Sequence, residues 1–310
     1  MTSSKSSGGV EHLSLDLWAA NLELLTLDLD SWLGGVEHRL AESAAREASA
    51  LIMPEYACAQ WLAVAPADLP PLGRLGWLAE VGVGALASMA ALSAHYGVSL
   101  LPGTIPHLVE GGPVIANRAW FLTADGKAFH QDKLSLTPME ETGDDGATAG
   151  GKDVNVFRWL GLRVAMIVCL DVEYTALWAR LGKLDLDLVL VPAKTDMITG
   201  YNRVFGCAWS RATELQTAVC VVGAVGVPMG QPATDTGVGG AAAFLPCDVS
   251  VSLDGIYASL PPQHASARTS LVLSVRDLPV GQCRRIRQGA AEAEVNPAAW
   301  SAGSRKFHDV

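Results

Sequence analysis

Short apolar runs that end abruptly in polar residues recur along the chain. Residues 50–53 end at Pro54-Glu55, residues 164–168 end at Cys169, and residues 188–191 end at Pro192-Ala193-Lys194. Runs of four to eight apolar residues bounded in this way are typical of strands buried on both faces. The pattern therefore predicts a sheet that is covered on both sides.

Helical patterns lie between these runs. Residues 32–48 contain Ala and Glu at a density that favours a helix, residues 75–95 are rich in Ala and Leu, and residues 204–217 repeat apolar positions near a period of 3.6. Helices that alternate with buried strands predict an α/β fold.

Two β-hairpins interrupt this alternation. Residues 119–123 and 128–131 flank Asp125-Gly126, a strong turn dipeptide, and residues 154–159 turn at Leu160-Gly161 and return as 163–168. Hairpins combined with strand-helix units predict a mixed sheet with helices outside it. Late strands are predicted at 248–252 and 271–276, and residues from about 277 to 310 read as an irregular C-terminal extension.

The composition favours one globular domain over residues 1–310. Half of the 310 residues are apolar and only 17% are charged, which excludes a disordered or coiled-coil chain. No Pro/Ser-rich linker or solenoid-length repeat divides the sequence. Residues 1–10 are rich in Ser and Gly with no apolar run behind them, so they are interpreted as a flexible tail and not as a signal peptide.

Charge and cysteine usage narrow the function classes. The 22 Lys and Arg against 32 Asp and Glu give a net charge of −10, and no basic stripe suggests binding to nucleic acid or an anionic membrane. The most apolar stretch, 81–94, is shorter than the roughly 20 residues of a membrane span. The six cysteines form no CxxC pair, which favours reduced thiols in a cytoplasmic protein over disulfides or a zinc site.

Three polar residues stand where predicted strands end: Glu55, Lys133 and Cys169. Singly, each has a structural explanation, as a solvated loop acid, an edge charge and a small core residue respectively. Together they place an acid, a base and a thiol at the strand ends, where α/β sheets bind ligands. The combination therefore suggests a catalytic site.

The segments around these residues resemble the carbon-nitrogen hydrolase (nitrilase) superfamily, whose members share a Glu-Lys-Cys triad. The resemblance follows the family's order over residues 37–226, and more weakly to about 276. It rests on Ala50-Leu51-Ile52-Met53-Pro54-Glu55, Leu101-Pro102-Gly103-Thr104-Ile105-Pro106, Ala116-Asn117-Arg118-Ala119-Trp120, Asp125-Gly126-Lys127, Gln131-Asp132-Lys133-Leu134-Ser135-Leu136-Thr137-Pro138-Met139-Glu140-Glu141, Cys169-Leu170-Asp171-Val172-Glu173-Tyr174 and Ser210-Arg211-Ala212-Thr213-Glu214.

The resemblance implies a four-layer α-β-β-α sandwich with two mixed sheets, and a homodimer or larger assembly. It implies Cys169 as nucleophile, Glu55 as general base, and Lys133 with the backbone N–H of Leu170 as oxyanion donors, so that no metal or other cofactor is needed. A second family glutamate follows the lysine by eight residues, which favours Glu141 over its neighbour Glu140. The candidate substrate-binding residues are Tyr56, Asp171, Glu173, Tyr174 and Lys194.

The expected reaction is hydrolysis of a small amide or carbamoyl amide by way of a Cys169 thioester. Nitrilases usually follow the nucleophile with Trp-Glu, and this chain has Leu170-Asp171, which favours amides over nitriles. Nitrile hydrolysis remains an alternative, as does a non-catalytic binding or scaffold protein on the same fold. The sequence contains neither GxSxG nor HExxH, which disfavours a serine or metal hydrolase.

Overall fold

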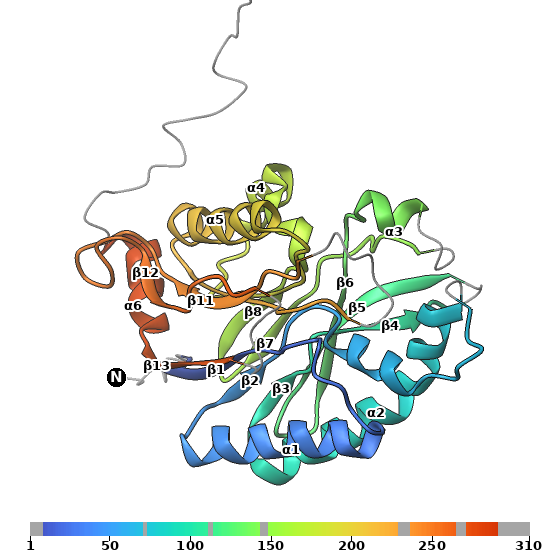
Figure 1. The fold of residues 1–310 in the computed structure, drawn as a ribbon. Coiled ribbons are helices and arrows are strands. Elements are labelled where there is room, and N and C mark those ends of the chain that lie inside the picture. The colour runs from blue at the N-terminus through green and yellow to red at the C-terminus, as the bar shows by residue number, and fades with distance from the viewer. Residues whose placement is uncertain are drawn as a thin grey trace, which may run out of the picture.

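The computed structural model describes residues 9–70, 73–110, 114–142, 148–228, 236–264 and 271–290. Its strands form two mixed sheets that lie between two layers of helices (Figure 1). The expected four-layer α/β sandwich with two mixed sheets is therefore confirmed.

The first sheet holds seven of the described strands. Parallel pairing joins β1, β2 and β3, and antiparallel pairing joins β13 to β1 and β5 to its three neighbours. In spatial order the strands are β13 (Leu271–Leu278), β1 (Leu13–Ala19), β2 (Ala50–Ile52), β3 (Ser99–Leu101) with β4 (Thr104–Leu108), β5 (Ile115–Leu122) and β6 (Ala128–Asp132).

The second sheet holds six described strands. Its centre is parallel, since β8, β9 and β10 run in one direction, whereas β7, β11 and β12 pair antiparallel to their neighbours. In spatial order the strands are β12 (Ile256–Ser259), β11 (Gly240–Phe244), β10 (Ala218–Gly223), β9 (Leu188–Ala193), β8 (Leu162–Met166) and β7 (Val156–Trp159).

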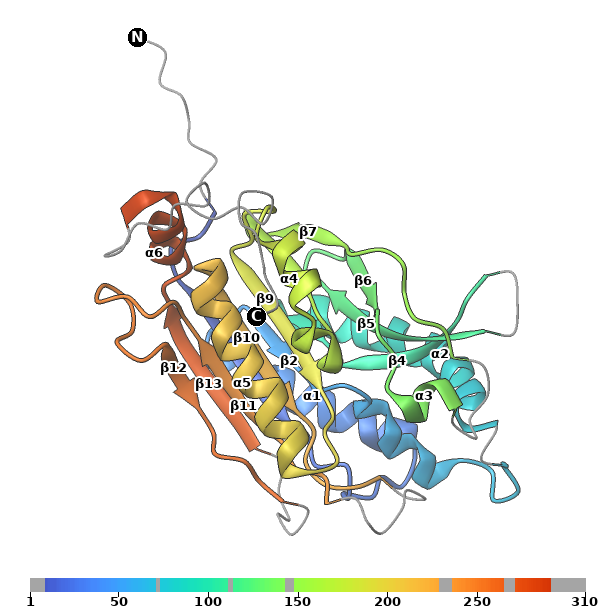
Figure 2. The same ribbon diagram turned by 90° about the horizontal axis from the view of Figure 1, so that it is seen from above.

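Helices cover the outer face of each sheet. Helices α1 (Leu29–Ala45) and α2 (Arg74–Tyr96) lie under the first sheet, and α4 (Thr175–Leu181) and α5 (Ile198–Leu215) lie over the second (Figures 1 and 2). Shorter helical turns complete the fold: η1 (Ala57–Val64), α3 (Pro138–Thr142), η3 (Cys169–Glu173), α6 (Val280–Arg285) and η4 (Ile286–Ala290).

The apolar runs of the sequence become the most buried strands. Every residue of β2, β9 and β10 is buried, because one face meets a helix layer and the other meets the opposite sheet. Both predicted hairpins are confirmed as β5–β6 and β7–β8. The inner faces of the two sheets share one apolar core, in which Leu17 and Val221 are fully buried.

Two late predictions need correction. Residues 248–252 form a turn closed by an isolated bridge between Asp248 and Ser252, not a strand. The extension from about 277 is not irregular throughout, since residues 280–290 are helical. Arg284 and Arg287 anchor that segment, each donating to the buried Asp187 carboxylate over 2.9 Å. The remainder, 291–310, and residues 1–8 of the predicted tail lie outside the described residues.

Helix α2 is long and apolar enough, by length and composition alone, to cross a membrane, and it is the one such helix among the described residues. In the structure α2 packs against β3, β4 and β5 of the first sheet, and its buried positions Leu78, Gly82, Ala85 and Met89 recur at helical spacing. A Cβ at Gly82 would lie 2.6 Å from Ile105 Cγ2. This glycine therefore allows the close approach of α2 to β4.

Candidate active site

Glu55 lies just beyond the end of β2, in a loop that the neighbouring strand holds in place. Gly103 has a positive φ of 83°, and a Cβ there would collide with the carbonyl oxygen of Pro54. Beside it, Thr104 Oγ1 accepts a hydrogen bond from the Tyr56 N–H at 3.0 Å. The motif Pro102-Gly103-Thr104 thus lets the loop pack tightly enough to bury Glu55, which is only 2% exposed.

Lys133 follows the end of β6 and is held by its backbone. Its N–H donates to the Asn117 carbonyl at 2.8 Å, and its own carbonyl accepts from Gly151 N–H at 2.7 Å. The side chain is 2% exposed, with Nζ 2.9 Å from Glu55 Oε1 and 2.8 Å from Glu140 Oε2. One ammonium therefore bridges two carboxylates inside the protein.

Cys169 begins the turn η3, three residues after β8. Its φ of 46° lies in the left-handed region, which a side chain other than Gly rarely adopts, and the chain changes direction sharply there. The thiol donates to the Lys194 carbonyl, with Sγ 3.5 Å from the oxygen. The N–H of the same Lys194 donates to Glu55 Oε2 at 2.9 Å.

These contacts bring the three predicted residues together between the two sheets. Glu55 and Lys133 follow strands of the first sheet, and Cys169 and Lys194 follow strands of the second. Glu55 Oε1 already accepts from Lys133 Nζ and from Asn117 Nδ2, at 2.9 and 2.8 Å. Oε2 accepts only one backbone N–H among the described contacts. Oε2 is thus the carboxylate oxygen with room for a proton from the thiol.

The electrostatics of the site keep the thiol neutral and the lysine charged. Burial raises the pKa of Cys169 well above its usual value, and the negative charge of Glu55 adds to this, while Lys133 acts in the opposite direction. Burial lowers the pKa of Lys133, but the charges of Glu55, Cys169 and Glu140 outweigh it, so the net pKa is well above normal.

Glu140, and not Glu141, is the second glutamate beside Lys133. Thr137 and Glu140 form a capping box at the start of α3: Glu140 N–H donates to Thr137 Oγ1 at 3.3 Å, and Thr137 N–H donates to Glu140 Oε2 at 2.8 Å. Burial raises the pKa of Glu140, but Lys133 and the hydrogen bonds from Thr137 and Asn117 outweigh it and lower the pKa. Glu141 is exposed. The spacing-based preference for Glu141 therefore does not match the geometry, and the Thr-x-x-Glu pattern at 137–140 is the sequence signal that indicates Glu140.

The other predicted site residues fall into different places. Leu170 is the second residue of η3, where the first N–H groups of a helical turn have no partner within that turn. Tyr56 OH donates to Glu140 Oε1 at 3.4 Å. The remaining side chains are directed to protein groups: Asp171 to the N–H groups of Leu134 and Ser135, Glu173 to Arg203, and Lys194 Nζ to Asp196; Tyr174 is 46% exposed.

Asn117 also belongs to this cluster, although its residue type alone predicts no role there. It is 1% exposed, and its Nδ2 donates both to Glu55 Oε1 and to Glu140 Oε1, at 2.8 and 3.1 Å. Its signal was its place in the Ala116-Asn117-Arg118 motif, opposite the end of β6. Asn117 therefore fixes the two carboxylates relative to each other.

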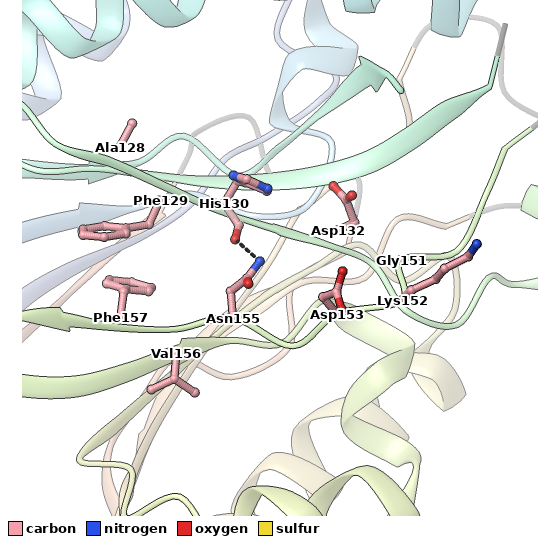
Figure 3. Close-up of a pocket in the computed structure, with 10 residues that line it drawn as sticks. All are labelled: Ala128, Phe129, His130, Asp132, Gly151, Lys152, Asp153, Asn155, Val156 and Phe157. Atoms are coloured by element: carbon pink, nitrogen blue, oxygen red, sulfur yellow. Dashed lines mark hydrogen bonds between the residues drawn. The ribbon is translucent and has the colours of Figure 1, made fainter. Parts of the chain in front are cut away.

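A cavity of about 500 Å³ lies beside the backbone of Lys133, and its lining does not include Glu55, Lys133 or Cys169. Figure 3 shows it between β6 and β7, lined at one end by Phe129 and Phe157, with Asn155 Nδ2 donating to the His130 carbonyl.

Among the described residues, no group of three or more His, Cys, Asp or Glu side chains could hold a metal ion. The arrangement of Glu55, Lys133 and Cys169 is suited to nucleophilic attack by sulfur on an electrophilic carbon.

Solved structures of known proteins share the fold of this chain. An amidase of the nitrilase superfamily from Nesterenkonia AN1, solved as a cysteine-to-alanine mutant, is similar to this chain with a TM-score of 0.65, 18% identity, and coverage of 90% of this chain and 95% of that one. The amidase from Nesterenkonia sp. AN1 in complex with butyramide gives 0.63, 19%, 90% and 95%. At these identities the likeness shows the shared fold.

Sequence comparison extends the likeness beyond the fold. The chain is 29% identical to the probable hydrolase YhcX of Bacillus subtilis (strain 168) over 171 residues, which are 55% of this chain and 33% of that protein, so the match spans about a third of the relative's length. The family model described as carbon-nitrogen hydrolase matches residues 20–258, a range that includes Glu55, Lys133 and Cys169. The chain belongs to the carbon-nitrogen hydrolase family.

Proposed function

We propose that this protein hydrolyses the C–N bond of a small amide through a thioester on Cys169. The observation that carries the proposal is the convergence of Glu55, Lys133 and Cys169, which are far apart in the sequence, around the backbone of Lys194. A variant of the Nesterenkonia amidase carries the acetamide moiety of fluoroacetamide covalently at its active-site cysteine, which supports covalent chemistry in a protein of this fold.

In the first half of the reaction, Cys169 Sγ attacks the amide carbon and a C–S bond forms. The thiol proton passes to Glu55 Oε2, the oxygen that has room to accept it. Lys133 Nζ and the Leu170 N–H stabilise the negative charge that develops on the substrate oxygen. Glu55 then returns the proton to the nitrogen as the C–N bond breaks, and ammonia or an amine leaves.

In the second half, water attacks the thioester carbon and gives a proton to Glu55. The C–S bond breaks, the carboxylic acid leaves, and the sulfur takes the proton back. A thiol that is neutral at rest fits this cycle, because the base that must accept its proton lies within the same buried cluster.

The proposal is tested by ammonia release from acetamide, propionamide, butyramide and a carbamoyl amide, with the matching nitriles in parallel. Cys169→Ala should abolish release, and Cys247→Ala, which changes an exposed thiol outside α4 and α5, should leave it unchanged. Mass spectrometry should find the acyl group on Cys169 during turnover. Release from nitriles alone would favour the nitrilase alternative, and release from neither substrate class would contradict the proposal.

We also propose that the active protein is a homodimer that pairs through α4 and α5. These helices adjoin η3, the turn that begins at Cys169. Tyr174, which directly precedes α4, is 46% exposed, and Trp209 on α5 is 42% exposed. Sedimentation velocity should give twice the 32.5 kDa chain mass, and Trp209→Glu should reduce it to the monomer. A monomer in the unmodified protein would contradict this part of the proposal.

A further inference from the structure

The carboxylate of Asp171 joins the two segments that carry the site. Asp171 lies in the nucleophile turn, residues 169–173, two residues after Cys169. Its Oδ2 accepts from the Leu134 N–H at 2.8 Å and its Oδ1 from the Ser135 N–H at 2.7 Å. Both donors belong to the lysine segment, residues 133–140, and follow Lys133 directly.

This contact is one of several that fix the lysine segment. The backbone of Lys133 is held by β5 and by Gly151, and the far end of the segment is held by the Thr137–Glu140 capping box. Asp171 holds the middle of the segment, between the two charged side chains that meet Glu55 and Asn117. It is the one of these contacts that ties the segment to the nucleophile turn.

We propose that Asp171 is a positioning residue for hydrolysis, whose carboxylate sets the place of Lys133 relative to Cys169 and the Leu170 N–H. The inference rests on the proposed function and deepens it. The two oxyanion donors come from different segments, Lys133 from one and Leu170 from the other, so their separation depends on what joins the segments. A displacement of about 1 Å in such a site costs roughly 10²-fold in rate.

Burying the charged carboxylate of Asp171 is energetically unfavourable, which argues that this residue has a function beyond packing. Asp171 is 1% exposed and no described ion pair includes it. Burial raises its pKa to about 6, although the N–H groups of Leu134 and Ser135 and the charge of Lys133 act in the opposite direction. Other charged groups near the turn have partners of their own: Glu173 with Arg203, Arg211 with Glu214, and Lys194 with Asp196.

Protonation of Asp171 would weaken the connection. A neutral carboxyl has one hydroxyl oxygen, which is a donor and a poorer acceptor, so one of the two N–H groups loses its partner. The connection should therefore hold above pH 6 and loosen as the pH falls through that value. Asp171→Asn reproduces the loosened state at every pH, because its NH₂ group faces an N–H donor.

The test measures alkylation of Cys169 by iodoacetamide, in which the S–C bond forms, iodide leaves and the thiol proton passes to Glu55. This readout does not require amide hydrolysis. The rate constant is measured from pH 5 to 9 by mass spectrometry, with Cys169→Ala as background. In the unmodified protein we expect the rate constant of alkylation to decrease as the pH is lowered below about 6. In Asp171→Asn we expect a rate at least tenfold lower at pH 7.5, with no step near pH 6.

The matched control is Asp187→Asn. Asp187 is also a buried carboxylate that accepts a backbone N–H, from Arg163 at 2.9 Å, but it lies at the other end of β9. This variant should lower the melting temperature and leave the pH profile of alkylation unchanged. If Asp171→Asn fails to fold, hydrogen exchange in the unmodified protein replaces it: protection of the Leu134 and Ser135 amides, corrected for intrinsic rates, should fall below pH 6 together with alkylation.

Two outcomes would overturn the inference: an Asp171→Asn profile equal to that of the unmodified protein, or protection of the two amides that does not change through pH 6. If the profile changes as expected but no amide is hydrolysed, the positioning role stands and the proposed substrate class is wrong. If amides are hydrolysed and the profile does not change, the proposed function stands and the positioning role of Asp171 is wrong.

Discussion

Lys133 Nζ lies 2.9 Å from Glu55 Oε1, and each side chain is only 2% exposed. Breaking a buried ion pair by removing one partner typically costs about 3–5 kcal/mol, because the remaining charge stays buried without compensation. In Lys133→Met two carboxylates, Glu55 and Glu140, would be left together. We expect a free energy of unfolding lower by about that amount and a loss of roughly 10²-fold or more in kcat, measured by urea denaturation and ammonia release.

The double variant Lys133→Met with Glu140→Gln separates the two effects. It removes one of the two uncompensated charges, so part of the stability should return, whereas activity should not. Full stability in Lys133→Met alone would contradict the charge assignment of this cluster.

The resting thiol should be neutral at pH 7. Burial and the charge of Glu55 raise the pKa of Cys169 above the ordinary value of 9.0, and a thiol with a raised pKa stays protonated until the pH exceeds it. The absorbance of a thiolate at 240 nm, taken as the difference between the unmodified protein and Cys169→Ala, should therefore show no titration of Cys169 between pH 5 and 9. A thiolate signal near neutral pH would mean that an ion pair exists before substrate binds.

The two adjacent glutamates provide a matched pair of variants. Glu140→Gln removes a carboxylate that lies 2.8 Å from Lys133 Nζ, so kcat should fall about 10- to 100-fold as the ammonium loses its support. Glu141→Gln changes an exposed side chain, so kcat should change less than about twofold. Steady-state kinetics on one amide checks both variants, and equal effects would show that the position of Glu140 does not matter to the reaction.

Gly103 and Gly126 have nearly the same positive φ, 83° and 84°. An added Cβ at Gly126 meets open space, whereas at Gly103 it collides with the Pro54 carbonyl oxygen beside Glu55. Gly126→Ala should cost about 1–2 kcal/mol of stability, the ordinary cost of a left-handed residue, with kcat retained. Gly103→Ala should cost more and lower kcat as well. Thermal melts and kinetics of both variants give the comparison, and equal losses would contradict a role for Gly103 in placing Glu55.

Much of the fold could be predicted because strands that are buried on both faces appear in the sequence as continuous apolar runs. Strands β2, β8 and β9 are evident as apolar runs, and the polar residues that follow them, Glu55, Cys169 and Lys194, meet between the two sheets. The Asp125-Gly126 turn likewise identified its hairpin. Local rules suffice for such features.

The parts that were missed depend on partners far apart in the chain. Lys194 acts on Glu55 and Cys169 through its backbone, which side-chain identity does not reveal. Asn117 gained its role from two carboxylates at positions 55 and 140. The helical segment at 280–290 is anchored by Asp187, about a hundred positions earlier, so its own composition did not indicate order. Glu140 is different, because its capping box with Thr137 involves residues only three positions apart and is visible in the local sequence.

Glu55 belongs to one sheet, and the N–H that holds its Oε2 belongs to the other. In the proposed mechanism, the alignment of Glu55 with Cys169 Sγ therefore depends on the relative position of the two sheets. Leu17 and Val221 lie in the core between the two sheets, so substitutions there would change this alignment without altering Glu55 or Cys169. The rate of the proposed reaction can therefore be altered by repacking the core between the sheets, with every residue that contacts Glu55 or Cys169 unchanged.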